Sequence, residues 1–248
     1  MLEMFARGDS LASAYHKSLY LLSHYGENVD CPDWDTTQKE LALTFTVDDA
    51  LTEPMISKLF IGGPHELEQY RQEMLDGILD FEIERGNWTY TYHDRYKDQY
   101  NFVIDELRRN PYSRRAVMCI RTPDDIGSSD PACLQHLQYF IRHNKLHCKV
   151  LFRSNDACKA TFMNAFALIM LQKRIADELG VGVGSYTHRA NSFHCYERDF
   201  EILDTYVDYI LKKPLEDLSY SYDDEWKELM EAEKESIQEK VRVLKEGD

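Results

Sequence analysis

The sequence contains no apolar run of the roughly 18 to 20 residues that a transmembrane helix requires. Residues 1–10 have neither the basic start nor the apolar stretch of a secretory signal peptide. We therefore expect a soluble, cytoplasmic protein with no membrane partner.

Basic residues are scarce compared with acidic ones. The 248 residues include 29 lysines and arginines against 44 aspartates and glutamates, which gives a formal net charge of −15. This charge would repel a nucleic acid unless a strong local basic patch compensated for it. The sequence has no such patch, so we expect no nucleic-acid partner.

Cysteine pairs at the spacing of common metal or redox motifs are also lacking. Six cysteines are present, none of them in a Cys-x-x-Cys pair. In a chain of this length without a secretory signal, reduced thiols are the expected form. His188, His194 and Cys195 match no common structural-zinc spacing, and we expect no metal.

The residues that are present indicate one folded domain of the α/β class. A content of 43% hydrophobic and 12% aromatic residues can form a large core. Hydrophobic periodicity predicts helices at residues 11–25, 66–78, 99–109 and 161–171. It predicts strands at 39–47, 116–120 and 186–193, and a hairpin over 137–153 with its turn at 143–145.

The last segment has a different composition. Residues 223–248 contain ten acids and five bases, with apolar residues interspersed. We expect a charged helical tail, solvated or packed against a partner, after a catalytic domain formed by residues 1–222.

Residues 87–100 concentrate aromatic side chains, namely Trp88, Tyr90, Tyr92, Tyr96 and Tyr100. Such a cluster is compatible with a core and its rim, or with the wall of a pocket.

The residues that indicate chemistry lie between positions 130 and 196. Cys133 stands two residues after Pro131, and Arg153 begins an Arg-Ser-Asn-Asp run that ends at Asp156. Asn164 follows Arg153 by eleven residues, and the segment His194-Cys195-Tyr196 comes later.

This combination resembles the thymidylate synthase family, which includes the pyrimidine nucleotide hydroxymethylases. Members carry a nucleophilic cysteine in a Pro-x-Cys or Pro-Cys segment, an Arg-Ser-x-Asp run, an asparagine eleven residues after that arginine, and a His-x-Tyr. The resemblance covers residues 111–200 well and the first hundred only loosely. The residues around Arg153 are most similar to the archaeal branch.

The resemblance implies a fold, an assembly and a reaction. The fold would be a mixed, twisted sheet packed against helices, assembled as a homodimer whose active sites are shared across the interface. The reaction would transfer a one-carbon unit to C5 of a pyrimidine nucleoside monophosphate. The donor would be 5,10-methylenetetrahydrofolate or another methylene-tetrahydropterin.

The same resemblance gives each matching position a role. Cys133 would be the nucleophile, Asp156 would contact the pterin, and Glu73 would organise water and proton transfer. The nucleotide would be held by Arg153 and Ser154 at its phosphate, by Asn164 at its base, by His194 and Tyr196 at its sugar, and by Arg114 and Arg115 of the neighbouring subunit.

The residue types suit the binding roles. A phosphate dianion is best held by several guanidinium groups, although arginines in an acidic chain often only pair with surface acids. The amide of Asn164 can donate to the C4 carbonyl of uracil and accept from its N3–H. Uracil is therefore favoured as the base.

The nucleophile follows from the reactivity of the pyrimidine ring. C5 of uracil becomes a carbon nucleophile only after a group adds at C6, and a cysteine thiolate suits that addition. Nearby arginines would lower the pKa of the Cys133 thiol. Cys119 and Cys148 lie inside apolar alternations and are expected to be inert core residues.

The sequence departs from the family pattern at several positions. Leu134 follows the cysteine where the common synthases have histidine, and Phe152 stands where they have glutamine. The N-terminal region lacks a clear match to the family's phosphate-binding arginine, and Arg7 is the candidate for that position. The charged tail replaces the short C-terminal segment that closes over the folate.

Three functions therefore stay open. Asn164 and the archaeal-like residues favour a thymidylate synthase, which converts dUMP to dTMP with hydride from the cofactor. Leu134, Phe152 and the missing closing segment favour a 5-hydroxymethylase of dUMP, dCMP or CMP, in which water completes the reaction. A non-catalytic nucleotide-binding relative would keep only the phosphate arginines.

Overall fold

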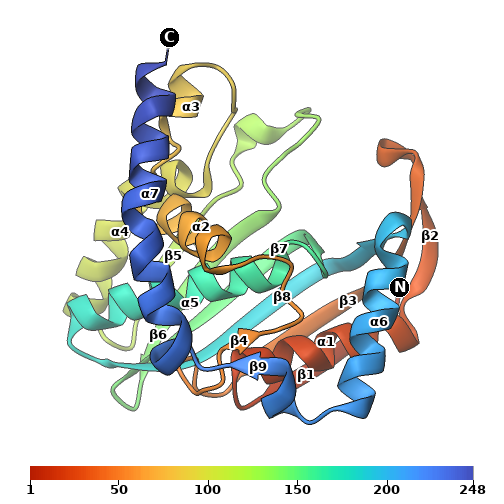
Figure 1. Ribbon diagram of the computed structural model, residues 1–248. Coiled ribbons are helices and arrows are strands. Elements are labelled where there is room, and N and C mark those ends of the chain that lie inside the picture. The colour runs from red at the N-terminus through yellow and green to blue at the C-terminus, as the bar shows by residue number, and fades with distance from the viewer. Residues whose placement is uncertain (248) are drawn as a thin grey trace.

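A seven-stranded sheet forms the centre of the protein (Figure 1), in the order β1-β3-β8-β7-β6-β5 with β2 paired to β3. The computed structural model describes residues 1–247; Asp248, the end of the predicted tail, lies outside them. The strands are β1 (Glu3–Gly8), β2 (Glu27–Cys31), β3 (Thr36–Val47), β5 (Val117–Cys119), β6 (Leu134–Arg142), β7 (Lys145–Asp156) and β8 (Gly182–Tyr196). Two short strands, β4 (Ile56–Ser57) and β9 (Ser219–Tyr220), pair with each other.

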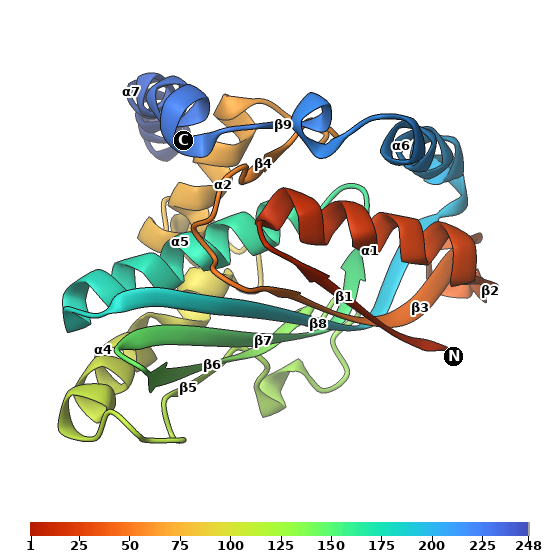
Figure 2. The same ribbon diagram turned by 90° about the horizontal axis from the view of Figure 1, so that it is seen from below.

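The sheet is mixed and is packed against helices, which confirms the predicted α/β fold. Strand β1 is parallel to β3 and β7 is parallel to β8, whereas the other neighbours are antiparallel. The helices are α1 (Leu11–Tyr25), α2 (Pro64–Asp76), α3 (Phe81–Glu84), α4 (Tyr92–Arg109), α5 (Thr161–Leu179), α6 (Phe200–Lys212) and α7 (Lys227–Glu246). Helices α1 and α5 lie against one face of the sheet (Figure 2). Within residues 1–247, no helix combines the length and apolarity needed to cross a membrane.

Helix α1 begins and ends where the sequence predicts. The Ser10 hydroxyl accepts the Ser13 N–H at 3.4 Å, and the Gly26 N–H donates to the Leu22 carbonyl at the other end. Its apolar side chains are buried against β1 and β3. A cap at each end and one apolar stripe therefore define this helix.

Strands β6 and β7 form the predicted hairpin. His143 and Asn144 make its turn with φ angles of 51° and 58°, in the left-handed region that tight hairpin turns use. Strand β7 continues to Asp156, and α5 begins at Thr161. The hairpin thus brings the start of β6 next to the end of β7, a few residues before the first turn of α5.

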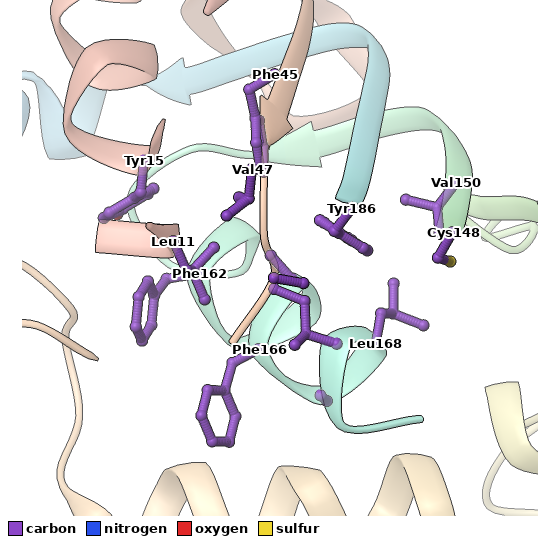
Figure 3. Close-up of a cluster of buried hydrophobic side chains, with 14 of the residues drawn as sticks. Leu11, Tyr15, Phe45, Val47, Cys148, Val150, Phe162, Phe166, Leu168 and Tyr186 are labelled. Atoms are coloured by element: carbon purple, nitrogen blue, oxygen red, sulfur yellow. The ribbon is translucent and has the colours of Figure 1, made fainter. Parts of the chain in front are cut away.

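The core lies between the sheet and the helices (Figure 3). Its large buried side chains include Tyr15, Phe45, Phe162, Phe166 and Tyr186. Helix α5 is buried almost all round, as its uninterrupted apolar sequence predicts. Cys148 belongs to this core, as predicted. Cys119 does not: it lies on the edge strand β5 with its side chain exposed, so the prediction of a core position was wrong.

Helix α4 is longer than predicted. It starts at Tyr92 rather than at residue 99, because Thr91 caps it by accepting the Asp94 N–H at 2.9 Å. The sequence did not predict these first turns, because their aromatic residues do not follow a helical pattern of burial. Among them, Tyr96 is the one that is fully buried.

The charged tail is helical, as predicted, but it packs against its own chain instead of being solvated or packed against a partner. A π-helical turn at Tyr222–Trp226 precedes α7. Met230, Ile237 and Val241 of α7 are buried where this helix lies along α2 (Figure 1). One apolar stripe therefore holds α7 against α2, although the rest of the helix surface is strongly charged.

Candidate active site

A pocket of 530 Å³ opens where β6 begins and β7 ends. It is lined by Asp33, Trp34, Ser128, Ser129, Asp130, Pro131, Cys133, Arg153, Ser154 and Tyr196, and we call it the Cys133 pocket. It brings together four of the predicted site residues, Cys133, Arg153, Ser154 and Tyr196. The hairpin register explains this, because Leu134 pairs with Phe152 and the Arg153 N–H donates to the Cys133 carbonyl at 2.8 Å.

The Arg153 side chain holds the loop that carries the cysteine. Its Nη2 donates to the Pro131 carbonyl at 2.6 Å and its Nε to the Ala132 carbonyl at 3.3 Å. The same Nη2 lies 3.9 Å from a carboxylate oxygen of Asp130. Arg153 therefore fixes the position of Cys133 as well as lining the pocket.

The Cys133 thiol is harder to ionise than an exposed cysteine. Burial raises its pKa, Arg153 lowers it and Asp130 raises it, with a net increase. Arg153 acts in the predicted direction, but desolvation outweighs it. The thiol is therefore protonated at neutral pH in the absence of substrate, and its attack requires loss of that proton.

His194 lies beside Ser154 because β7 and β8 are parallel and in register. Asp156 is paired with His194, and the His194 Nδ1 lies 3.4 Å from the Ser154 hydroxyl oxygen and 3.3 Å from the Ser192 carbonyl. Burial lowers the pKa of His194, although Asp156 opposes this. His194 does not itself line the Cys133 pocket, but its imidazole packs edge-on to Tyr196, which does, with ring centroids 4.8 Å apart.

Asp156 caps the turn that enters α5. Its Oδ1 accepts the backbone N–H groups of Cys158 at 3.0 Å and of Lys159 at 2.9 Å. The preceding residue, Asn155, is buried and bonds to Thr161 and His188. The end of β7 is therefore rigidly tied to both α5 and β8.

His188 supports this strand end from the core. Its ring stacks between Phe45 and Phe152, with centroids 4.7 and 4.6 Å away. Its two nitrogens lie 2.9 Å from the Tyr186 hydroxyl and 2.9 Å from the Asn155 amide oxygen. Burial lowers its pKa to about 3. Within residues 1–247, no group of three or more His, Cys, Asp or Glu side chains is arranged to hold a metal.

A second pocket, of 160 Å³, has aromatic walls, and we call it the aromatic pocket. It is lined by Tyr70, Glu73, Met74, Leu79, Trp88, Tyr90, Thr91 and Tyr92. The segment 87–100 therefore supplies a pocket wall, which was one of its two interpretations. The Leu134 N–H lies 3.4 Å from the Tyr92 hydroxyl, which links this pocket to the residue after Cys133.

Glu73 is half-buried in the aromatic pocket. Burial raises the pKa of its carboxyl, while the Gln69 amide, which donates to it at 2.8 Å, opposes the increase. A carboxyl in such surroundings can take up and release a proton nearer to neutral pH than an exposed glutamate.

Asn164 is buried in the first turn of α5 and has a side-chain partner, as predicted from the cost of burying an unpaired amide. The partner is Tyr70 of α2, whose hydroxyl donates to the Asn164 Oδ1. Asn164 lines neither of the two pockets. Sequence analysis missed Tyr70, although its position three residues before Glu73 places both on the same side of a helix.

Arg114 and Arg115 lie away from both pockets of their own chain. Arg115 is paired with Glu106 at 2.9 Å. Hydrogen bonds from Ser113 and Arg109 lower the pKa of this glutamate to about 2. The Arg114 guanidinium makes no hydrogen bond or ion pair within the described residues, so it is free to bind an external anion.

Asp33, Trp34 and Asp130 line the Cys133 pocket and were not predicted as site residues. Asp33 and Trp34 come from the short connection between β2 and β3, where Asp35 has a φ of 48°. Trp34 is 64% exposed, and an indole in a tight turn was the signal that could have identified it. Arg7 is not in this pocket, because it pairs with Asp48 at 2.7 Å.

Comparisons with known proteins agree with the geometry. The thymidylate synthase family profile matches residues 65–240. A protein of Methanocaldococcus jannaschii that bears the provisional name of a thymidylate synthase is 34% identical over 218 residues, which cover 82% of this chain and 96% of that protein. The thymidylate synthase of Bacillus subtilis subsp. natto is 30% identical over 173 residues, covering 68% of this chain and 60% of the enzyme.

A solved structure agrees with the fold. Thermostable thymidylate synthase A from Bacillus subtilis superimposes with a TM-score of 0.64 at 17% identity, covering 80% of this chain and 84% of that one. The chain therefore belongs to the thymidylate synthase family, whose members are enzymes that transfer a one-carbon unit to C5 of a pyrimidine nucleotide.

Proposed function

We propose that this protein is a thymidylate synthase that converts dUMP to dTMP with Cys133 as its nucleophile. The observation that carries the proposal is the Cys133 pocket, which Cys133, Arg153 and Ser154 line together. An anionic nucleotide bound by Arg153 and Ser154 would place its ring near the sulfur. His194 and Tyr196 stand beside Ser154, where a sugar hydroxyl would lie.

The cofactor we propose is 5,10-methylenetetrahydrofolate or a related methylene-tetrahydropterin, bound in the aromatic pocket. Trp88, Tyr90 and Tyr92 can stack on a flat heteroaromatic ring, and Glu73 can bind its N–H groups. When bound, the cofactor supplies the methylene carbon and the hydride. Asp156 ends β7 and lines neither pocket. Both of its backbone bonds are on Oδ1, so its Oδ2 would be available to a pterin N–H.

The chain's own residues would prepare the pyrimidine for attack. The Cys133 thiol loses its proton and its sulfur bonds to C6, so that the electron pair of the C5–C6 double bond moves toward the C4 carbonyl. Asn164 lines neither pocket, but its partner Tyr70 lines the aromatic pocket beside it. In a bound complex, the Asn164 amide would donate to that carbonyl and stabilise its negative charge. The half-buried Glu73 would assist the later loss of the C5 proton through water.

A homodimer would complete the phosphate site. Asp33 and Asp130 face the Cys133 pocket together with one guanidinium, so the pocket of one chain has an excess of acid. Arg153 shares one side of β7 with Lys149 and Leu151, on the face away from the core. A second copy packed on this face would bring its unpaired Arg114 toward the phosphate.

The test is exchange of the C5 hydrogen of dUMP, which reports the covalent adduct. We expect the parent protein to release tritium from [5-³H]dUMP and Cys133→Ala to reduce release at least about a thousandfold. Cys119→Ala is the matched control, because its exposed side chain lines neither pocket. Equal release by Cys133→Ala and the parent would reject the nucleophile. Binding of dUMP without any release would identify a non-catalytic nucleotide-binding relative.

A 5-hydroxymethylase is the second candidate, and the position of α7 favours it. The C-terminal chain is held along α2, and its end lies near α3, where the Arg85 guanidinium donates to the Leu244 carbonyl at 2.6 Å. No residue of α7 is among those that line the Cys133 pocket. Mass spectrometry of the product separates the two candidates. A methyl group at C5 supports the synthase, and a hydroxymethyl group supports the alternative.

A further inference from the structure

We infer that Tyr70 sets the choice of base, because it fixes which end of the Asn164 amide lies at C4 of the pyrimidine and which end lies at N3. This inference rests on the proposed function, in which Asn164 contacts the base. The relevant contact is the hydrogen bond from the Tyr70 hydroxyl to the Asn164 Oδ1. Tyr70 would be a positioning residue that acts through Asn164.

The direction of this hydrogen bond follows from the partners that are available. The Tyr70 hydroxyl makes no other hydrogen bond within the described residues. If the amide were reversed, its nitrogen would face the hydroxyl, and the Tyr70 proton would be left without a partner in a buried place. Burial and the neighbouring Tyr92 raise the pKa of Tyr70 well above its usual value, so the phenol stays a donor. The amide oxygen is therefore the end that Tyr70 holds.

The rest of the amide is left for a ligand. Its nitrogen makes no hydrogen bond within residues 1–247, and it is not among the fully enclosed polar atoms that lack a partner. The surroundings of Asn164 are otherwise rigid, since its backbone N–H donates to the Ala160 carbonyl at 2.9 Å. Thus the backbone is fixed by the helix, and the orientation of the amide is fixed by Tyr70.

Amide orientation matters because uracil and cytosine present reversed patterns. Uracil offers an acceptor at C4 and a donor at N3, whereas cytosine offers a donor at C4 and an acceptor at N3. A carboxamide turned by half a rotation about its last bond changes from one pattern to the other. That torsion is intrinsically broad, so the neighbours of the amide decide its orientation. Without the Tyr70 hydroxyl, both orientations become available and both bases can be matched.

The experiment compares dUMP with dCMP in the parent and in Tyr70→Phe. Release of tritium from C5 gives kcat/KM for each nucleotide, and the quantity of interest is the ratio of the two values. We expect Tyr70→Phe to lower the dUMP-to-dCMP ratio roughly tenfold, the effect of one hydrogen bond of ordinary strength. Tyr70→Met, which also lacks the hydroxyl, should lower the ratio in the same way. Tyr70→Met provides the same test if Tyr70→Phe fails to fold.

Tyr96→Phe is the matched control. It removes another buried tyrosine hydroxyl, which donates to the Met74 carbonyl and not to Asn164. Its ratio should stay within about twofold of the parent value, even if its stability falls. A purely structural role for Tyr70 would lower both kcat/KM values equally and leave their ratio unchanged.

The outcomes are distinguishable. Exchange by the parent with an unchanged ratio in both Tyr70 variants overturns this inference and leaves the proposed function in place. No exchange by the parent with either nucleotide overturns the proposed function, and the inference with it. A ratio that falls in the Tyr70 variants but not in Tyr96→Phe supports the inference.

Discussion

Leu134 and Phe152 face each other across β6 and β7, and both side chains are fully buried. Leu134 follows Cys133 and Phe152 precedes Arg153. At both positions the chain departs from the common synthases. Phe152 also stacks on His188. The two departures therefore form one packing unit in the core, and neither side chain lines the Cys133 pocket.

Polar side chains introduced singly at these positions should destabilise the protein. We expect Leu134→His and Phe152→Gln each to lower the free energy of unfolding by about 2–4 kcal/mol, because each replaces core packing with a buried polar group. Urea denaturation followed by circular dichroism measures this. Leu211→Gln on α6 is the control, because that leucine is 63% exposed. Core variants as stable as the control would contradict the packing argument.

The reactivity of Cys133 should depend on pH through the groups around it. Burial raises its pKa, and Asp130 and Arg153 act in opposite directions. Because the thiolate is the reactive form, alkylation by iodoacetamide should increase as pH rises, with a midpoint above that of an ordinary thiol. Asp130→Asn should move the midpoint down and Arg153→Gln should move it up.

Peptide mass spectrometry can follow Cys133 and the exposed Cys119 in the same sample, so that Cys119 serves as the internal control. A Cys133 midpoint that responds to neither substitution would show that the two charges do not reach the sulfur.

Replacement of the amide by an acid should alter the choice of base. Cytosine has an exocyclic amine and an unprotonated N3, which a carboxyl group serves better than an amide whose orientation is fixed by Tyr70. We expect Asn164→Asp to lower the dUMP-to-dCMP ratio of kcat/KM by at least about tenfold. An unchanged ratio would mean that Asn164 does not contact the base.

The shared site can be tested by mixing two inactive variants. We expect Cys133→Ala and Arg114→Ala each to be strongly impaired alone, since one lacks the nucleophile and the other lacks a phosphate ligand. Subunit exchange would create heterodimers with one intact site, and activity should return to about a quarter of the parent value. Mixtures that remain as inactive as their components would contradict the proposed role of Arg114 across an interface. Glu106 holds Arg115 in its own chain, so Arg115→Ala serves as a comparison.

The sequence by itself determined most of the local structure. Helix α1, with Ser10 and Gly26 at its ends, and the hairpin around His143 and Asn144 were predicted correctly. In both cases the signal is local, because caps, turns and side-chain periodicity depend on residues close in the chain. The spacing from Cys133 through Arg153 to Tyr196 likewise predicted a group of residues, and the register of three strands places it in one pocket.

Only the tertiary structure decided the electrostatic and packing relationships between distant segments. The net effect on the Cys133 pKa depends on desolvation, which no spacing of arginines reveals. The partner of Asn164 is Tyr70, which lies 94 positions away in the chain. Asp33 and Trp34 enter the pocket from the β2–β3 connection because β3 pairs with β8. Such contacts arise from the packing of complete elements, so sequence periodicity gives the elements and the folded chain gives their neighbours.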